Sequence, residues 1–438
     1  MTRNVFVIGV NDLNRRLLGT IRNGEGYAFH DVLRPQEVED PTEYRAEDLL
    51  DQARAELRRF PGSIDAIVGY IDIPVTLMVP ILCREFGVPS PSLESVLKCQ
   101  HKYWSRLQQR EVIPEHIPRF CRLDPFDEAS IQGVDLGYPF WLKPVKSAGS
   151  FLGYRIANGR QLREKTAIIR EHIARVAQPF DYLLGFADIP PEVADVDGRF
   201  CIAEGLISGR QCTLEGYVYQ GDVRVYGVVD SIRYPNRSSF FRYQYPSQLP
   251  RRVVERMSGV VARVLRHVGL DSSAFNAELF WDERRDRIWL LEINTRISQS
   301  HSPLFELVDG ASNHQVMVEC GLGQRPASPH REGRFACAAK FFYRRFRDAR
   351  IDRVPSEDEV RAIERRFPGT SIKVNVSAGI DLSELIEQDS YSYDLAWIFT
   401  GARNRRELLQ RYRACVDALG LRFTEIDRSA RPRRVAGG

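Results

Sequence analysis

Two carboxylates and an amide lie in two strand-like segments of the sequence, 277–281 and 288–293. Glu278 belongs to the first segment, and Glu292 and Asn294 come at the end of the second. Residues two apart in a strand point to the same face. If the segments pair as an antiparallel hairpin, Glu278 joins that face from across the ladder. Such a set of oxygen ligands suits Mg²⁺ ions that also hold phosphate oxygens.

A charged group in so apolar a strand costs free energy unless it is paired or bound to a metal. Arg296 follows Asn294 by two residues and could neutralise the charge of a transferring phosphate. Two other interpretations remain open on these residues alone. The carboxylates could form ion pairs with arginines at a sheet edge, or the triad could serve a metal-dependent hydrolase that uses no ATP.

Two lysines and a small-residue loop precede the carboxylates along the chain. Lys102 and Lys143 lie far apart in sequence, and Lys143 stands inside an apolar strand directly before a proline. Buried lysines usually have an anionic partner. The loop that follows Lys143 contains residues whose backbone N–H groups can approach phosphates closely, namely Ser147, Ala148, Gly149 and Ser150.

The elements that must position these residues can be outlined from the apolar pattern. Apolar runs at 5–10 and 64–69 with a charged helical segment between them predict a small open α/β sheet at the N-terminus. We expect a helix over 95–109, strands over 139–144, 182–186 and 200–203, a hairpin over 213–229 that turns at Gly221, and a helix over 251–268.

These elements predict three domains and a tail. The expected domains are a Rossmann-like N-terminal domain over 1–97, a central domain over 98–325, and a C-terminal α+β lobe over 326–427. The basic segment 428–438 is expected to be disordered.

The overall composition is that of a globular protein. The 438 residues are 43% hydrophobic and 27% charged, and 62 basic against 58 acidic residues give a net charge of only +4. The net charge is therefore too small to indicate a protein that binds nucleic acid. Eight scattered cysteines without a CxxC pair favour reduced thiols, and the longest apolar stretch, 73–82, is too short to span a bilayer. We expect a cytoplasmic enzyme without membrane or nucleic-acid partners.

From about residue 5 to 320, the lysines, the small-residue loop and the carboxylate hairpin occur in an order that resembles the ATP-grasp superfamily. The C-terminal portion is similar to its carboxylase-like and L-amino-acid-ligase branches. The resemblance implies an α/β ATP-grasp fold that binds ATP and Mg²⁺, with Mn²⁺ as an alternative. It implies that the central domain carries a lid at about 135–205, in which 147–150 form the lid loop. It also implies that Lys102 and Lys143 contact the ATP phosphates and that Glu278, Glu292 and Asn294 bind the metal. It also gives Lys143, Asn294 and Arg296 catalytic roles, with Arg296 at the acyl phosphate.

The resemblance also places the nucleotide base and sugar. The hinge that grips adenine matches 203–209, where Glu204 would accept from the adenine amino group and the backbone of Leu206 and Ile207 would contact the ring. Relatives often hold the ribose with a glutamate just after the hinge. Here Gln211 stands at that position, with Glu215 four residues further on, so either could contact the ribose.

The implied reaction joins a small-molecule carboxylate to an amine through an acyl phosphate, with release of ADP and phosphate. A nucleotide-pathway ligase, a carboxylase component and a catalytically silent ATP-binding protein are the alternatives, and a homodimer is expected by analogy alone. The candidate substrate residues are Asp72 after the second N-terminal strand, Arg233 and Tyr245 in an Arg/Tyr-rich segment, and Ser298 and His301 after the metal strand.

Overall fold

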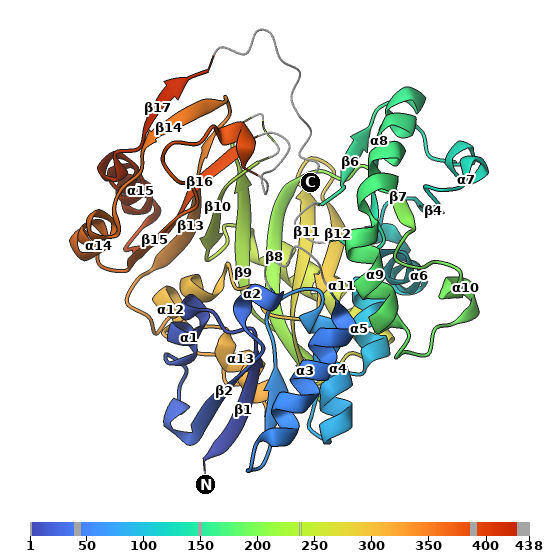
Figure 1. Ribbon diagram of the computed structural model, residues 1–438, viewed down its shortest axis with the longest axis horizontal. Coiled ribbons are helices and arrows are strands. Elements are labelled where there is room, and N and C mark those ends of the chain that lie inside the picture. Colours follow the sequence, from blue (N-terminus) through green and yellow to red (C-terminus); the bar gives the residue numbers. More distant parts are fainter. Residues whose placement is uncertain are drawn as a thin grey trace. The chain divides into compact units, whose positions relative to one another are not determined.

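The computed structural model describes residues 2–38, 45–147, 151–235, 237, 239–385 and 392–426. The chain divides into two compact units (Figure 1). The first comprises Met1–Val228, Leu249–Gln299 and Asn313–Ser328, and the second comprises Val229–Gln248, Ser300–Ser312 and Pro329–Gly438. The second unit thus begins its longest segment close to the boundary expected after residue 325. It also takes in two earlier segments, because these supply a strand and a helix to its sheet.

A parallel three-stranded sheet begins the first unit, in the order β2-β1-β3. Its central strand is buried from Val5 to Ile8, as expected of an apolar run covered on both faces. The open α/β sheet predicted here is confirmed. Its elements are β1 (Arg3–Ile8), α1 (Asp12–Leu18), β2 (Tyr27–Val32), α2 (Pro35–Val38), α3 (Ala46–Arg59), β3 (Ala66–Val68) and α4 (Val75–Phe86).

Two helices follow where the sequence predicted one over 95–109. They are α5 (Leu93–Gln100) and α6 (Lys102–Val112). The chain turns at His101, whose Nδ1 accepts a hydrogen bond from the Trp104 N–H and so caps α6. The prediction of one continuous helix was therefore wrong, and the break places Lys102 at the first residue of a helix.

An antiparallel sheet in the order β4-β7-β5-β6 has a hydrophobic core of its own. It includes the predicted lid, 135–205, but begins earlier, at Phe120 of β4. The strand predicted at 182–186 is wrong. Residues up to Leu184 belong to helix α9, because Ala177, Phe180 and Leu183 recur at helical spacing on its buried face. The elements are β4 (Phe120–Leu123), α7 (Glu128–Gln132), β5 (Phe140–Pro144), β6 (Tyr154–Ile156), α8 (Gly159–His172), α9 (Ala174–Leu184), α10 (Pro191–Ala194) and β7 (Cys201–Gly205).

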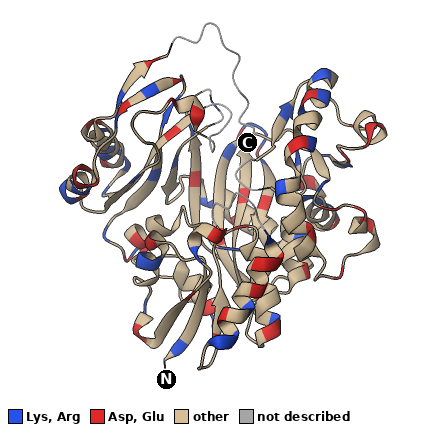
Figure 2. Ribbon diagram, in the orientation of Figure 1, with Lys and Arg blue, Asp and Glu red and all other residues tan. Residues whose placement is uncertain are grey.

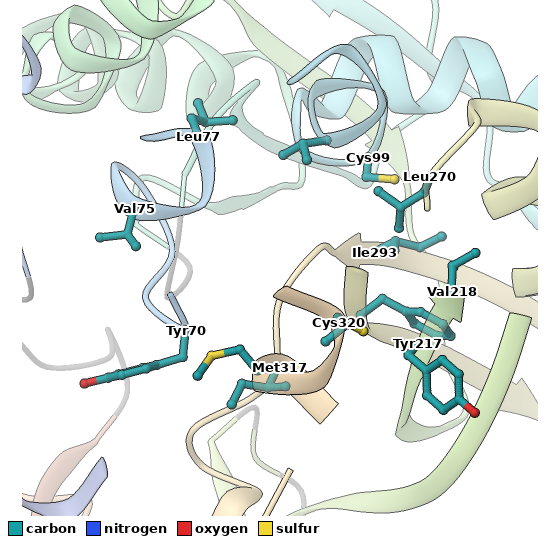
Figure 3. Close-up of a cluster of buried hydrophobic side chains, with 14 of the residues drawn as sticks. Tyr70, Val75, Leu77, Cys99, Tyr217, Val218, Leu270, Ile293, Met317 and Cys320 are labelled. Carbon is teal, nitrogen blue, oxygen red and sulfur yellow. The ribbon is translucent and has the colours of Figure 1, made fainter. Parts of the chain in front are cut away.

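The first unit also contains the strands β12-β11-β8-β9 in that order. Helix α11 (Arg251–Val268), with the bounds that its apolar spacing predicted, buries Val253, Met257, Val261 and Val264. Figure 3 shows part of this unit's core, where Val218, Leu270 and Ile293 lie close together. The other elements are β8 (Arg210–Tyr219), β9 (Asp222–Arg233), β11 (Ser273–Asp282), β12 (Arg287–Asn294) and α13 (His314–Gly321).

The second unit contains the end of β9 and then the strands β10-β13-β16-β15, all antiparallel. A separate pair, β14 and β17, packs with its own small apolar cluster. The elements are β10 (Phe240–Tyr245), α12 (Ser302–Asp309), β13 (Cys337–Arg345), β14 (Ala349–Arg353), α14 (Glu357–Arg366), β15 (Thr370–Val374), β16 (Tyr393–Ala402), α15 (Arg405–Leu419) and β17 (Arg422–Glu425).

Basic and acidic residues are interspersed along the helices and strands (Figure 2). All eight cysteines are free thiols, which agrees with the absence of a disulfide pattern in the sequence. In the described parts of the chain, no helix combines the length and the apolar character needed to cross a membrane.

Candidate active site

The predicted carboxylate pair forms at the β11–β12 hairpin. The two strands are antiparallel, and Glu278 stands directly opposite Glu292, as expected. Asn294 is opposite Asn276, two residues along each strand, so the three predicted ligands lie on one face of the hairpin. A bulge between Glu278 and Leu279 interrupts the ladder at this point, which is a common feature beside active sites.

Asn276 orients the amide of this set, and sequence analysis did not identify it. The Asn294 Nδ2 donates to Asn276 Oδ1 at 3.1 Å, and the Asn276 Nδ2 donates to the backbone carbonyl of Arg296 at 3.0 Å. The amide oxygen of Asn294 is therefore the atom available to a cation. Two carboxylates and one oriented amide oxygen fit the hard oxygen ligands that Mg²⁺ requires. Among the described residues no group of three or more His, Cys, Asp and Glu is placed to hold a metal ion, and the predicted set contains only two carboxylates.

Lys102 lies beside the carboxylate pair. Its Nζ is 4.0 Å from Glu292 Oε2 and donates to the backbone carbonyl of Ser147 at 2.8 Å. Burial lowers the pKa of Lys102 to about 8, although Glu292 partly opposes this, and Lys143 and Lys146 lower the pKa further. An ammonium held this loosely by its nearest carboxylate retains the capacity to bind another anion.

Lys143 and the hinge glutamate are joined in an ion pair. Lys143 Nζ lies 2.7 Å from Glu204 Oε2, and Arg106 Nε lies 2.6 Å from Glu204 Oε1. Burial alone would raise the pKa of Glu204, but the two cations outweigh it and hold the pKa at about 2. Arg106 also donates to the backbone carbonyls of Leu290 and Leu291, at 3.1 and 2.8 Å, and so ties α6 to β12.

Asp72 holds two cations at the end of the N-terminal sheet. Its carboxylate accepts from Lys146 Nζ at 2.7 Å and from Arg296 at 2.9 Å. Lys146 Nζ donates as well to Gln100 Oε1 at 2.7 Å. Burial opposes ionisation of Asp72, yet Lys146 and Arg296 hold its pKa well below the usual range. Asp72 is a predicted substrate residue. Its ion pair with Arg296 fixes the position of that guanidinium.

The predicted nucleotide-base residues follow strand β7. Leu206 is 43% exposed, unusually high for a large apolar side chain, and Ile207 is half-buried. Of the two ribose candidates, Gln211 donates to Glu278 Oε2 at 2.8 Å and so lies at the metal face. Glu215 is fully buried, and the Tyr226 hydroxyl and the Asn313 amide donate to it at 3.4 and 3.5 Å.

The remaining predicted residues are those of the lid loop and four substrate candidates. Ala148, Gly149 and Ser150 of the lid loop lie outside the described residues. Ser298 belongs to the first unit, and its backbone carbonyl accepts from Asn313 at 3.3 Å.

The other three candidates belong to the second unit, where each contacts an aromatic ring. The Arg233 guanidinium stacks over Phe240 at 4.3 Å, and His301 packs edge-on against Tyr243. Tyr245 is 2% exposed, with its hydroxyl donating to Asp309 at 2.7 Å, so both its ring and its hydroxyl are taken up inside the unit.

Two residues that the sequence analysis missed carried recognisable signals. Asn276 precedes Glu278 by two residues, so it shares the metal face of the same strand. Arg106 follows Lys102 by four residues and so lies on the same face of its helix. The roles of Lys146 and Gln100 had no such signal, because their shared contact joins residues 46 positions apart.

Comparison with known proteins gives three kinds of similarity. Residues 136–303 match a family model described as an ATP-grasp domain. An uncharacterised protein, y4rH, of Sinorhizobium fredii is 26% identical over 373 residues, which cover 81% of this chain and 68% of that protein.

Among solved structures, an L-amino acid ligase from Bacillus licheniformis is similar with a TM-score of 0.68 and 15% identity, over 97% of this chain and 99% of that one. A biotin carboxylase from Campylobacter jejuni has a TM-score of 0.63 and 14% identity, over 97% and 93% of the two chains. An N5-carboxyaminoimidazole synthase from Aspergillus clavatus, in complex with ADP and an aminoimidazole ribonucleotide, has a TM-score of 0.63 and 15% identity, over 95% and 99%.

Proposed function

The chain has the ATP-grasp fold and contains an ATP-grasp domain, and from its site we propose that it is an ADP-forming carboxylate–amine ligase. The observation that carries the proposal is the hairpin face on which Glu278 opposes Glu292, beside the oriented amide of Asn294 and the ammonium of Lys102. The carboxylate oxygens can bind a metal ion, and the loosely paired lysine can bind phosphate. Together they suit a metal–triphosphate complex better than a cation or an anion alone.

The balance of charge in the cluster supports an anionic ligand. Glu204 is shared by two cations, and Asp72 by two more, while Lys102 is only 4.0 Å from a predicted metal ligand. Cations therefore exceed the carboxylates that neutralise them. Glu278, Glu292 and Asn294 would hold Mg²⁺, which neutralises phosphate charge when bound.

The side chains of the site would position groups for two transfers. With Lys102 and Lys143 at the phosphates, a substrate carboxylate oxygen attacks the γ-phosphorus, and the bond from that phosphorus to the β–γ bridging oxygen breaks, giving ADP and an acyl phosphate. A neutral amine nitrogen then attacks the acyl carbon, the carbon–oxygen bond to phosphate breaks, and the nitrogen loses its extra proton to yield an amide. Arg296, held by Asp72, would stabilise the phosphate charge in both steps.

A screen for ADP release tests the proposal. Purified protein with Mg-ATP is incubated with pairs of amino acids and with amino acids plus polyamines, and products of active pairs are identified by mass. We expect a product that has lost one water relative to the two substrates. Glu292→Gln should lower the turnover by at least about 100-fold, because it removes a ligand charge in the phosphoryl-transfer step. The control is Glu283→Gln, an exposed glutamate in the turn of the same hairpin, which should keep full turnover. Full activity of Glu292→Gln would refute the metal assignment.

A nucleotide-pathway ligase is less well supported. Such an enzyme would need a cationic phosphate site beside the N-terminal sheet, and Arg15 in that region is already paired with Asp31. Including bicarbonate and an aminoimidazole ribonucleotide in the screen separates the two functions, because ADP release with those compounds alone would favour the nucleotide pathway.

A further inference from the structure

Lys340 lies in an aromatic environment on β13 in the second unit. In the sheet it is in register with Tyr243 on β10 and with Phe399 on β16. Its Nζ is 3.6 Å from the centre of the Trp397 ring, 4.9 Å from that of Phe342 and 5.5 Å from that of Phe399. The residue is only 3% exposed. A cation this close to an indole face is attracted by the ring, but the rings supply no strong hydrogen-bond acceptor.

The ammonium of Lys340 has no counter-ion in the described parts of the chain. Its one hydrogen bond there goes to Ser300 Oγ, at 3.0 Å. An ammonium carries three N–H donors, so two of them have no hydrogen-bond acceptor among the described residues. Charged groups that are buried in proteins are normally paired, because an unpaired charge is costly to remove from water. This environment lacks one negative group.

The charged neighbours of Lys340 do not supply that group. Asp394 on β16 accepts from the Trp397 indole at 2.6 Å and pairs with Arg344 at 3.3 Å. Lys373 on β15 lies 4.9 Å from the Trp397 ring and adds a further positive charge. Burial lowers the pKa of Lys340 to about 7, a shift that Asp394 opposes and that Lys373 and Arg344 increase. Burial and the two neighbouring cations thus hold the charged form of Lys340 at an energetic disadvantage.

We propose that the second unit contains a binding site for a small-molecule carboxylate, in which Lys340 and Ser300 hold the carboxylate group and Trp397 contacts the apolar part of the ligand. The two free N–H donors of Lys340 match two carboxylate oxygens. The Ser300 oxygen accepts from Lys340, which leaves the hydroxyl hydrogen as a third donor. Ser300 and Trp397, which contact the buried ammonium, are themselves both partly exposed. The inference concerns binding in the second unit and does not rest on the proposed ligase chemistry.

Trace labelling of lysines tests the site in the full-length protein without ATP. A limiting amine-reactive reagent is applied across pH 5 to 10, and mass spectrometry follows the labelling of Lys340 and of the exposed Lys373. The probes are acetate, 3-phenylpropionate and L-phenylalanine, with 2-phenylethylamine as the analogue that lacks a carboxylate. A bound carboxylate stabilises the ammonium and raises its pKa, so labelling of Lys340 at pH 7.5 should fall with the aromatic carboxylates and should not fall with 2-phenylethylamine.

Variants then show which groups bind the probe. Calorimetry with 3-phenylpropionate or L-phenylalanine should give a dissociation constant raised by about 10- to 100-fold in Lys340→Met, since charge-assisted hydrogen bonds are lost. Ser300→Ala should raise it less, by several-fold, and is the milder variant if Lys340→Met fails to fold. The control is Lys373→Met, which should change the constant by less than about threefold.

The pH dependence of binding adds a second readout. Wild-type affinity should fall as the pH rises from 6 to 9, because the ammonium is present below its pKa and is lost above it. The titratable or charged groups that surround Lys340 are Tyr243 on β10, Arg344 on β13, Lys373 on β15, Asp394 on β16 and His301 at the start of α12. The dependence should disappear in Lys340→Met if Lys340 is its source. The proposal is overturned if no carboxylate probe protects Lys340, if 2-phenylethylamine protects it equally, or if Lys340→Met binds the probes as wild type does.

Discussion

At the scale of single residues, the site depends on two carboxylates that each hold two cations. Glu204 binds Arg106 and Lys143, and Asp72 binds Lys146 and Arg296. Such a shared carboxylate cannot be removed without leaving two positive charges close together. The effects of replacing Glu204 or Asp72 on stability and on catalysis can therefore be measured separately from the effects of replacing the predicted metal ligands.

Glu204→Gln should lower the free energy of unfolding at pH 7 by about 3 kcal/mol, the equivalent of moving the pKa from about 4.5 to about 2. The folded pKa is depressed, so this contribution is present above about pH 4.5 and is lost as the pH falls toward 2. Urea titrations at several pH values should show the wild type and the variant converging in acid. Glu192→Gln, at an exposed position on α10, should follow the wild type throughout. A constant difference between Glu204→Gln and wild type would contradict the assignment.

Asp72→Asn should lower kcat by about 10- to 100-fold, since Arg296 loses the group that fixes it. The KM for ATP should change much less, because the ion-pair partners of Asp72 are Lys146 and Arg296 and not the predicted phosphate ligands Lys102 and Lys143. Steady-state kinetics with a pair from the ADP-release screen give both constants. Asp51→Asn, an exposed carboxylate in the same domain, serves as the control. Equal losses in kcat and in ATP affinity would argue instead for general damage to the nucleotide site.

At the scale of elements, the β11–β12 hairpin is the structure that positions the proposed metal ligands. Antiparallel pairing puts Glu278 opposite Glu292, and the neighbouring pair, Asn276 and Asn294, fixes the amide. The hairpin and its one-sided ligands could be predicted from spacing alone. The orienting role of Asn276 could not, because a carboxamide in a strand has many possible partners and the sequence does not choose among them.

Asn276→Ala should raise the Mg²⁺ concentration needed for half-maximal ADP release by about 10- to 100-fold, the usual effect of losing a group that orients a metal ligand. Asn276→Asp still accepts from Asn294 but no longer donates to the Arg296 carbonyl, so its effect should be smaller. Magnesium titrations of the two variants beside wild type measure this. An unchanged Mg²⁺ requirement in Asn276→Ala would remove Asn276 from the site.

Gly209, where the hinge meets β8, should not tolerate a side chain. Its φ is +139°, and an added Cβ would lie 2.3 Å from the backbone oxygen of Trp281 on β11. We expect Gly209→Ala to lower the free energy of unfolding by about 2–4 kcal/mol. Gly259→Ala is the matched substitution, because it has open space within α11 and should raise stability by about 0.5–1 kcal/mol. Chemical unfolding of both variants tests the pair, and similar effects of the same sign would contradict the geometry.

Local propensity misled the prediction at two other elements. The apolar residues at 182–186 suggested a strand, but they continue the buried face of α9 from Ala177 and Phe180. The helix predicted over 95–109 is broken at His101, whose side chain caps the second helix. In both places contacts with distant residues, such as that of His101 with the Val196 carbonyl, decide the outcome.

At the scale of the whole molecule, the fold class was predicted correctly. Ordered motifs such as Lys102, Lys143 and the Glu278–Asn294 segment were sufficient to predict an ATP-grasp fold, and the similarity to an ATP-grasp domain and to ligase structures bears this out. The second unit was harder to predict. Its segment 229–248 joins β13 through β10, a pairing between residues about 100 positions apart that no local pattern specifies.

The aromatic environment of Lys340 illustrates the same limit. Tyr243, Lys340 and Trp397 come from three strands, and each alone is an ordinary strand residue. Their chemistry arises only when the sheet assembles, so the sequence analysis could propose Arg233 and Tyr245 in this region but had no basis for choosing Lys340.

In the proposed reaction, ATP activates a carboxylate as an acyl phosphate. The most direct test uses a substrate acid from the ADP-release screen with both carboxylate oxygens replaced by ¹⁸O, with Mg-ATP and the amine, followed by mass analysis of the released phosphate and nucleotide. Attack of the carboxylate on the γ-phosphorus predicts one ¹⁸O atom in inorganic phosphate and none in the nucleotide, which should be ADP. Label found in AMP, or unlabelled inorganic phosphate released as the amide forms, would show that the carboxylate does not attack the γ-phosphorus.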